Sequence, residues 1–121
     1  MKYLALIYVS EKDQQAKGEA HMTALFDEYV KYEGYLASEK PGKKIAGEAL
    51  QPIGTATTVR IRDGKRLVTD DPFAETKEQL GDFYLYEAAN LDEALDLAAR
   101  IPDAKYGTIE VRPLMVFEGM S

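Results

Sequence analysis

Residues 68–88, VTDDPFAETKEQLGDFYLYEA, join two strand-like segments through a polar loop, and the expected fold is arranged around them. Pro72 has a fixed φ and no N–H donor, so it holds Asp71 in an extended conformation. Asp70 can accept hydrogen bonds from amides beyond it, and Phe73 can anchor the loop on apolar surface. The pattern fits an ordered crossover loop with a structural aspartate, or a functional site built on the loop.

The segments before this loop predict a strand and a long helix. Residues 3–9 are continuously apolar and predict a central strand that is buried on both faces. From Glu19 onward, apolar residues recur with a helical period, and Pro41 and Gly42 end the helix. The stripe expected to be buried consists of Met22, Leu25, Phe26, Tyr29, Tyr32 and Leu36.

A hairpin signal precedes the loop. Residues 45–50 and 55–62 predict strands, and Asp63-Gly64 is typical of a two-residue turn that returns the chain through residues 66–69.

Another strand, a helix and a last strand follow the loop. Residues 83–89 predict a strand, and Asn90 is a capping residue for a helix that ends at Pro102. Its buried stripe is expected to contain Leu91, Ala94, Leu95, Ala98 and Ile101. Residues 108–114 alternate as a strand does, and residues 115–121 form a tail or an extra edge strand.

The order of these elements predicts an α+β fold. Without the hairpin the order is βαββαβ, the ferredoxin-like plan, with two helices on one face of an antiparallel sheet. The other face then has nothing to cover it and would expose a large apolar patch. We therefore expect a homodimer in which a second copy packs on that face.

Composition limits the class of protein. The 121 residues suit one domain, 1–121, and the 45% apolar content argues against disorder. The net charge of −6, without a basic run, makes nucleic acid and anionic membrane poor partners. The chain has no cysteine and one histidine, and no phosphate-binding glycine loop, so we expect neither a metal nor a cofactor. Residues 3–9 are too short for a signal peptide, which predicts a cytoplasmic location.

Much of the chain resembles the DGPF-domain group of the YCII-related family. The resemblance rests on MKYLALIY at the start, GEALQPIGTATTVRIRDGKRLVTD in the middle, TDDPFAETKEQLGDFYLYEAANLDEALDLAARIP after it, and YGTIEVRPLM near the end. The family usually has Gly where this chain has Asp71, and often where it has Asp82. The resemblance implies a ferredoxin-like, dimeric α/β-barrel. It also implies a mostly unassigned activity, and a genetic link to extracytoplasmic-function sigma factors in some members.

Two residues are candidate acid or base groups. Asp70 lies in the matched loop, where a shifted pKa would suit it to catalysis, although Lys77 or Arg60 can instead hold it as an ion pair. His21 is the only histidine and lies at the flank of the helical stripe, with Glu28 placed to orient it. YCII-related proteins outside this group are discussed as carrying a His–Asp pair, to which His21 is a loose match.

Other polar residues predict a ligand site. Arg60, Arg62, Glu110 and Arg112 occupy alternate strand positions and are expected to share the helix-free face. There they can orient an anionic ligand or form an ion-pair network between subunits. The predicted ligand-binding set is Arg60, Phe73, Lys77, Glu110 and Arg112.

Two functions remain open from the sequence. The first is a small-molecule-binding or accessory protein linked to an extracytoplasmic-function sigma factor. The alternative is a cofactor-independent lyase or isomerase that acts on a small oxygen-rich organic molecule, with Asp70 as acid or base. Fold-level analogy with other dimeric α/β-barrels is what suggests the enzyme.

Overall fold

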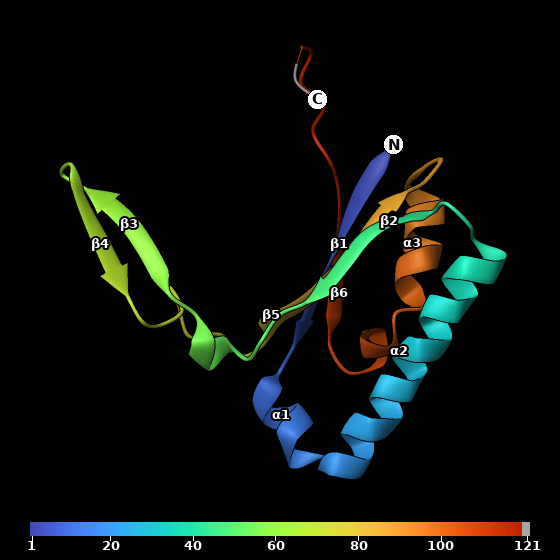
Figure 1. Ribbon diagram of the computed structural model, residues 1–121, viewed down its shortest axis with the longest axis horizontal. Coiled ribbons are helices and arrows are strands. Elements are labelled where there is room, and N and C mark those ends of the chain that lie inside the picture. Colours follow the sequence, from blue (N-terminus) through green and yellow to red (C-terminus); the bar gives the residue numbers. More distant parts are fainter. Residues whose placement is uncertain (120–121) are drawn as a thin grey trace.

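A four-stranded antiparallel sheet forms the centre of the protein, whose computed structural model describes residues 1–119. The strand order is β2-β5-β1-β6, with β1 at Lys2–Val9, β2 at Lys44–Ala49, β5 at Gln79–Glu87 and β6 at Thr108–Pro113. Two helices, α2 (Glu19–Glu39) and α3 (Leu91–Ala99), lie on the same face of this sheet (Figure 1). The predicted α+β, ferredoxin-like βαββαβ plan with an added hairpin is confirmed.

The added hairpin is a separate two-stranded sheet of β3 (Thr58–Arg62) and β4 (Lys65–Thr69). Asp63 has φ 53° and Gly64 has φ 73°, and a two-residue hairpin turn needs positive φ at both positions. The turn predicted at Asp63-Gly64 is therefore confirmed. Two short 3-10 helices complete the chain, η1 at Ile53–Thr55 and η2 at Pro102–Lys105.

The short helix α1 (Glu11–Ala16) lies in a polar segment and was not predicted. It begins at Ser10, whose hydroxyl accepts a hydrogen bond from the Asp13 amide at 3.2 Å. The helix carries Gln14, which is one of the few buried polar residues. This helix could not be recognised in the sequence, because it is polar, buries one residue and shows no helical period of apolar residues.

The core lies between the sheet and the helices. Ala5 and Ile7 of β1 pack with Tyr84 and Tyr86 of β5 and with Leu97 of α3. The stripe predicted for the long helix is only partly buried. Leu25, Tyr32 and Leu36 are buried, whereas Met22 and Phe26 are exposed, because they face an open cavity beside α2. On α3, Leu91 and Leu95 are exposed as well, so the prediction that they are buried was wrong.

The sheet has one covered and one open face. Tyr3, Ala5 and Ile7 of β1 are buried under the helices, while Leu4 and Leu6 point the other way and are half-buried. Within residues 1–119 no element covers that second face, so β1 is not buried on both faces as predicted. Over the same residues, no helix combines the length and apolarity needed to cross a membrane. The cytoplasmic location stays a prediction.

Gly107 fixes the connection between η2 and β6. A Cβ atom built at this position would lie 2.0 Å from the backbone oxygen of Tyr8. Only glycine allows the chain to pass so close to β1. The Gly107 amide also donates to the backbone oxygen of Asp103 at 2.8 Å, which ties the residue before β6 to η2.

Candidate functional site

A hydrogen-bonded polar network lies where α1, α2 and η2 meet. Asp103 of η2 is only 5% exposed, and both of its carboxylate oxygens accept hydrogen bonds. The Gln14 side-chain amide donates to Oδ1 at 2.9 Å, and the Tyr29 hydroxyl donates to Oδ2 at 2.6 Å. These two bonds satisfy a carboxylate that burial would otherwise destabilise.

His21 extends this network toward the surface. Its Nε2 lies 2.6 Å from Oε1 of Gln14, and its ring packs edge-on against Tyr106. Because the Gln14 amide nitrogen faces the Asp103 carboxylate, its Oε1 can only accept a hydrogen bond. His21 must therefore carry a proton on Nε2, and the donors run in one direction from His21 through Gln14 to Asp103.

Asp82 of β5 is the acid group that faces open space. It lines a cavity of about 410 Å³ whose walls include Phe26 of α2 and Leu50. It also lines an adjoining cavity of about 440 Å³ between α2 and the edge strand β2. We call these two cavities the α2 groove. Phe26 and Tyr29 line both of them, so an acid group and two aromatic rings share one space of ligand size.

Burial raises the pKa of the Asp82 carboxyl to about 6, and the nearby negative charge of Asp103 adds to the shift. The hydroxyl of Tyr29 is affected in the same sense: burial first, then its hydrogen bond to Asp103, raise its pKa. Tyr29 therefore remains a hydrogen-bond donor, while Asp82 changes its charge near neutral pH.

Replacing Asp82 by Asn is expected to stabilise the fold at pH 8 and not at pH 4. The folded protein holds the Asp82 proton up to about pH 6, whereas the ordinary pKa is 3.8, so stability falls as the pH rises between these values. A shift of about two pKa units corresponds to ~3 kcal/mol, and solvent screening at this partly open site reduces it to ~1–2 kcal/mol. Urea unfolding at both pH values measures the gain, with Asp70→Asn as the exposed control. An equal effect of Asp82→Asn at both values would contradict the shifted pKa.

The residues predicted from the sequence do not form one site. Asp70 directly follows β4 and is exposed, and neither ion pair suggested for it, with Lys77 or with Arg60, forms within residues 1–119. His21 lies instead in the polar network where α1, α2 and η2 meet. Glu28, proposed as its partner, instead pairs with Lys105.

The predicted ligand-binding residues are spread over three places. Arg60 and Phe73 line a small cavity of about 290 Å³ on the hairpin, and Lys77 is exposed in the following loop. Glu110 and Arg112 lie on the helix-free face of β6, since they pair with Leu6 and Leu4. Arg60 and Arg62 belong to the separate hairpin sheet, so the expectation that all four share the main sheet's open face was wrong.

Sequence reasoning missed the residues that the structure brings together. Asp82 was noted only as a departure from a family glycine, and Tyr29 only as part of an apolar stripe. The available signal was an acid in the middle of a strand with apolar residues on both sides, a position where charged residues are rare. Gln14 and Asp103 are 89 residues apart in the chain, and no local pattern joins them.

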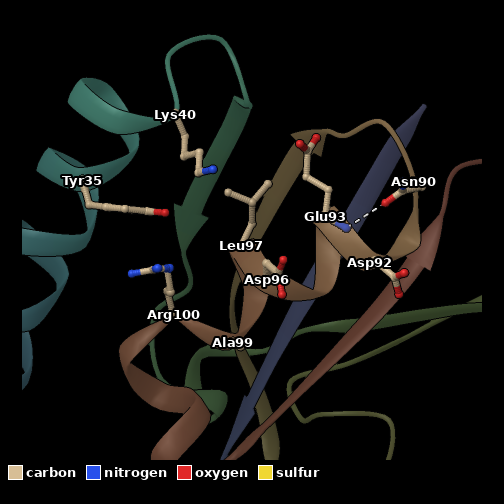
Figure 2. A pocket seen from close by; sticks show the side chains of 9 residues that line it. All are labelled: Tyr35, Lys40, Asn90, Asp92, Glu93, Asp96, Leu97, Ala99 and Arg100. Atoms are coloured by element: carbon tan, nitrogen blue, oxygen red, sulfur yellow. Dashed lines mark hydrogen bonds between the residues drawn. The ribbon is translucent and has the colours of Figure 1, made fainter.

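A larger cavity, about 730 Å³, lies between the end of α2 and α3. Figure 2 shows Arg100 extended toward Tyr35 on one wall, with Asp92 and Asp96 on α3. The Arg100 guanidinium lies 4.4 Å from the centre of the Tyr35 ring. Arg100, Asp92 and Asp96 are all exposed. We favour the α2 groove because it has a buried polar network and an acid with a raised pKa.

Within residues 1–119, no cluster of three or more histidine or acidic side chains is arranged to hold a metal ion. The α2 groove brings together side-chain carboxyls, a phenol and, through Gln14, an imidazole.

Comparison with known proteins agrees with the fold. A structure of 5-chloro-2-hydroxyhydroquinone dehydrochlorinase, TftG, from Burkholderia phenoliruptrix AC1100, bound to 2,5-dihydroxybenzoquinone, superposes with a TM-score of 0.51. The alignment covers 95% of this chain and 94% of that one, at 19% identity. Both chains therefore share the same α+β class of fold.

The chain belongs to the YCII-related family, because the YCII-related domain matches residues 1–118. An uncharacterized protein of Rhizobium meliloti (strain 1021) is 49% identical over 71 residues. That match spans 57% of this chain and 57% of the relative, so it leaves a large part of both unaligned. The family predicted from the sequence is confirmed.

Proposed function

We propose that this protein binds a small, oxygen-rich cyclic molecule in the α2 groove, and that Asp82 takes up and returns a proton there. The observation that carries the proposal is a half-buried carboxyl whose pKa is raised to about 6 and which lines both cavities of the groove. A pKa near the working pH lets one carboxyl act as base and then as acid.

The neighbouring network supports this division of roles. The two oxygens of Asp103 are occupied by Gln14 and Tyr29, so its negative charge is fixed in place. That charge helps Asp82 to hold its proton. As a base, the Asp82 carboxylate accepts a proton from a ligand hydroxyl or carbon and becomes a neutral acid. Returning the proton to another atom of the ligand restores the carboxylate.

The walls of the groove support the ligand class. Phe26 and Tyr29 offer aromatic surface for a flat ring, and Asp82 and Glu11 offer oxygen acceptors for hydroxyl groups. The structural neighbour is named as a dehydrochlorinase of a chlorinated hydroxyhydroquinone. We use that name only to choose a test compound for binding. Proton transfer is also the step that a cofactor-independent lyase or isomerase needs, with Asp82 in the role the sequence suggested for Asp70.

Binding of 2-hydroxyhydroquinone under anaerobic conditions tests the proposal. At pH 7.5 the ionised Asp82 is expected to accept a hydrogen bond from a ring hydroxyl. Asp82→Asn should then weaken binding roughly tenfold to a hundredfold, as expected for losing a charge-assisted hydrogen bond. Affinity of the wild type should fall as the pH drops below about 6. Titration calorimetry measures both effects.

Asp70→Asn is the matched control, because it makes the same change on an exposed carboxyl outside the groove. It should leave the affinity unchanged. Weaker binding by Asp70→Asn together with normal binding by Asp82→Asn would place the ligand site at the 68–88 loop and contradict the proposal. A link to a sigma factor stays a prediction from the family resemblance.

We also propose that the protein is a homodimer whose helix-free faces pack together. Leu4 and Leu6 of β1 lie beside Leu85 and Phe83 of β5 on this face, and all four are half-buried. Such a continuous apolar surface favours a partner of the same kind. Glu110 and Arg112 flank it on β6, where they can pair across the interface.

A further inference from the structure

The β3–β4 hairpin stands apart from the body of the molecule. In Figure 1 it lies on the side of the main sheet opposite to the helices. Its two strands pair only with each other among residues 1–119, and all of their residues except Thr58 are exposed. A single two-stranded ribbon is marginally stable in water, so its strands need packing from elsewhere.

One face of the hairpin is apolar and uncovered. The register pairs Val59 with Val68 and Ile61 with Arg66, which puts three branched apolar side chains on one face. Val59 and Ile61 are each 61% exposed, and Val68 is 54% exposed. The opposite face differs, because Pro72 and Phe73 form a small cavity with it. Exposed apolar side chains gathered in this way mark an interaction surface.

The charge of the hairpin is opposite to that of the rest of the chain. Residues 58–69 contain four of the fifteen basic residues and one of the twenty-one acidic residues. The other residues are therefore strongly acidic. A basic, apolar ribbon and an acidic body are complementary surfaces, and each copy of the chain carries both.

We propose that the hairpin is a dimerisation arm that docks its Val59, Ile61 and Val68 face on a second copy of this chain. The inference rests on the proposed homodimer. A partner packed on the helix-free face lies on the same side of the sheet as the hairpin and meets it there. Arg66, which pairs with Ile61 on the same face, then faces acidic surface of the partner. By the two-fold symmetry of such a dimer, both arms make the same contact.

Sedimentation equilibrium of the full chain tests the arm. The double variant Val59→Asp with Ile61→Asp should raise the dimer dissociation constant by roughly tenfold or more, since it puts charge into the contact. Val59→Thr with Ile61→Thr keeps branched, strand-forming side chains, so the hairpin should stay folded and the dissociation constant should rise less. A graded rise across the two variants would then reflect the lost contact and not an unfolded hairpin. Leu95→Asp is the matched control, because Leu95 is 46% exposed on the helix side. It should leave the dimer unchanged.

The basic residues add a second readout. Dimerisation of the wild type should weaken as salt rises from 0.05 to 1 M, and the Arg66→Glu variant should weaken it further at low salt, on the order of tenfold. A dimeric wild type whose dissociation constant is the same in all hairpin variants would overturn the arm and leave the homodimer standing. A wild type that is monomeric at micromolar concentration would overturn both, without affecting ligand binding in the α2 groove.

Discussion

Asp103→Ala is expected to lower the free energy of unfolding by about 3 kcal/mol at pH 7. The change removes an acceptor of two hydrogen bonds and leaves the Tyr29 hydroxyl and the Gln14 amide without their partner in a buried place. Each hydrogen bond to a charged group contributes about 1.5–3 kcal/mol, and relief from burying the carboxylate offsets part of the sum. Urea unfolding followed by circular dichroism measures the loss.

Two comparisons show whether the network is the cause. Tyr29→Phe removes one donor and keeps the ring, so it should cost about 1 kcal/mol. In Asp103→Ala the pKa of Asp82 should also fall, because the neighbouring negative charge has gone. If Asp103→Ala unfolds with the stability of the wild type, the network does not hold α1, α2 and η2 together.

Gly107→Ala is expected to cost about 3 kcal/mol, although it adds a single methyl group. The new Cβ would lie 2.0 Å from the backbone oxygen of Tyr8, and backbone cannot rotate away as a side chain can. Either the β1–β6 pairing or η2 must shift, which would also displace Asp103. Thermal unfolding of the variant measures the loss.

Gly34→Ala is the control for this variant. Gly34 lies within α2, and its added methyl group would meet nothing within 4 Å, so the change should stabilise the fold by roughly 0.5–1 kcal/mol. Equal effects at the two glycines would mean that conformational freedom, and not the contact with Tyr8, sets the outcome at Gly107.

Local signals in the sequence were sufficient for most of the fold. Asp63-Gly64 defined the hairpin turn, and the predicted cap at Asn90 is present, with its side chain accepting from the Glu93 amide at 2.9 Å. Errors arose where tertiary packing decides. Met22 and Phe26 fit a buried helical stripe, but both line the open α2 groove and stay exposed.

The candidate site was much less predictable than the fold. Gln14, Asp82 and Asp103 come from three elements, and their proximity depends on how α1 and η2 meet the end of the sheet. The 68–88 loop looked functional because it is polar and specific in sequence, but the structure places Asp70 in an exposed position just after β4, at the base of the hairpin. The burial that raises the pKa of Asp82 depends on tertiary packing, and its local signal was only the position of an acid within a strand.

A pH titration of the Asp82 carboxyl carbon by NMR tests the central claim most directly. Carboxyl ¹³C resonances are followed from pH 3 to pH 9 in the wild type, and the signal missing from Asp82→Asn identifies the residue. The titration should give Asp82 a pKa of about 6, because its carboxyl is partly buried and lies near the negative charge of Asp103. A pKa at or below the ordinary value of 3.8 would show a permanently ionised surface acid, and the proposed proton exchange at Asp82 would be contradicted.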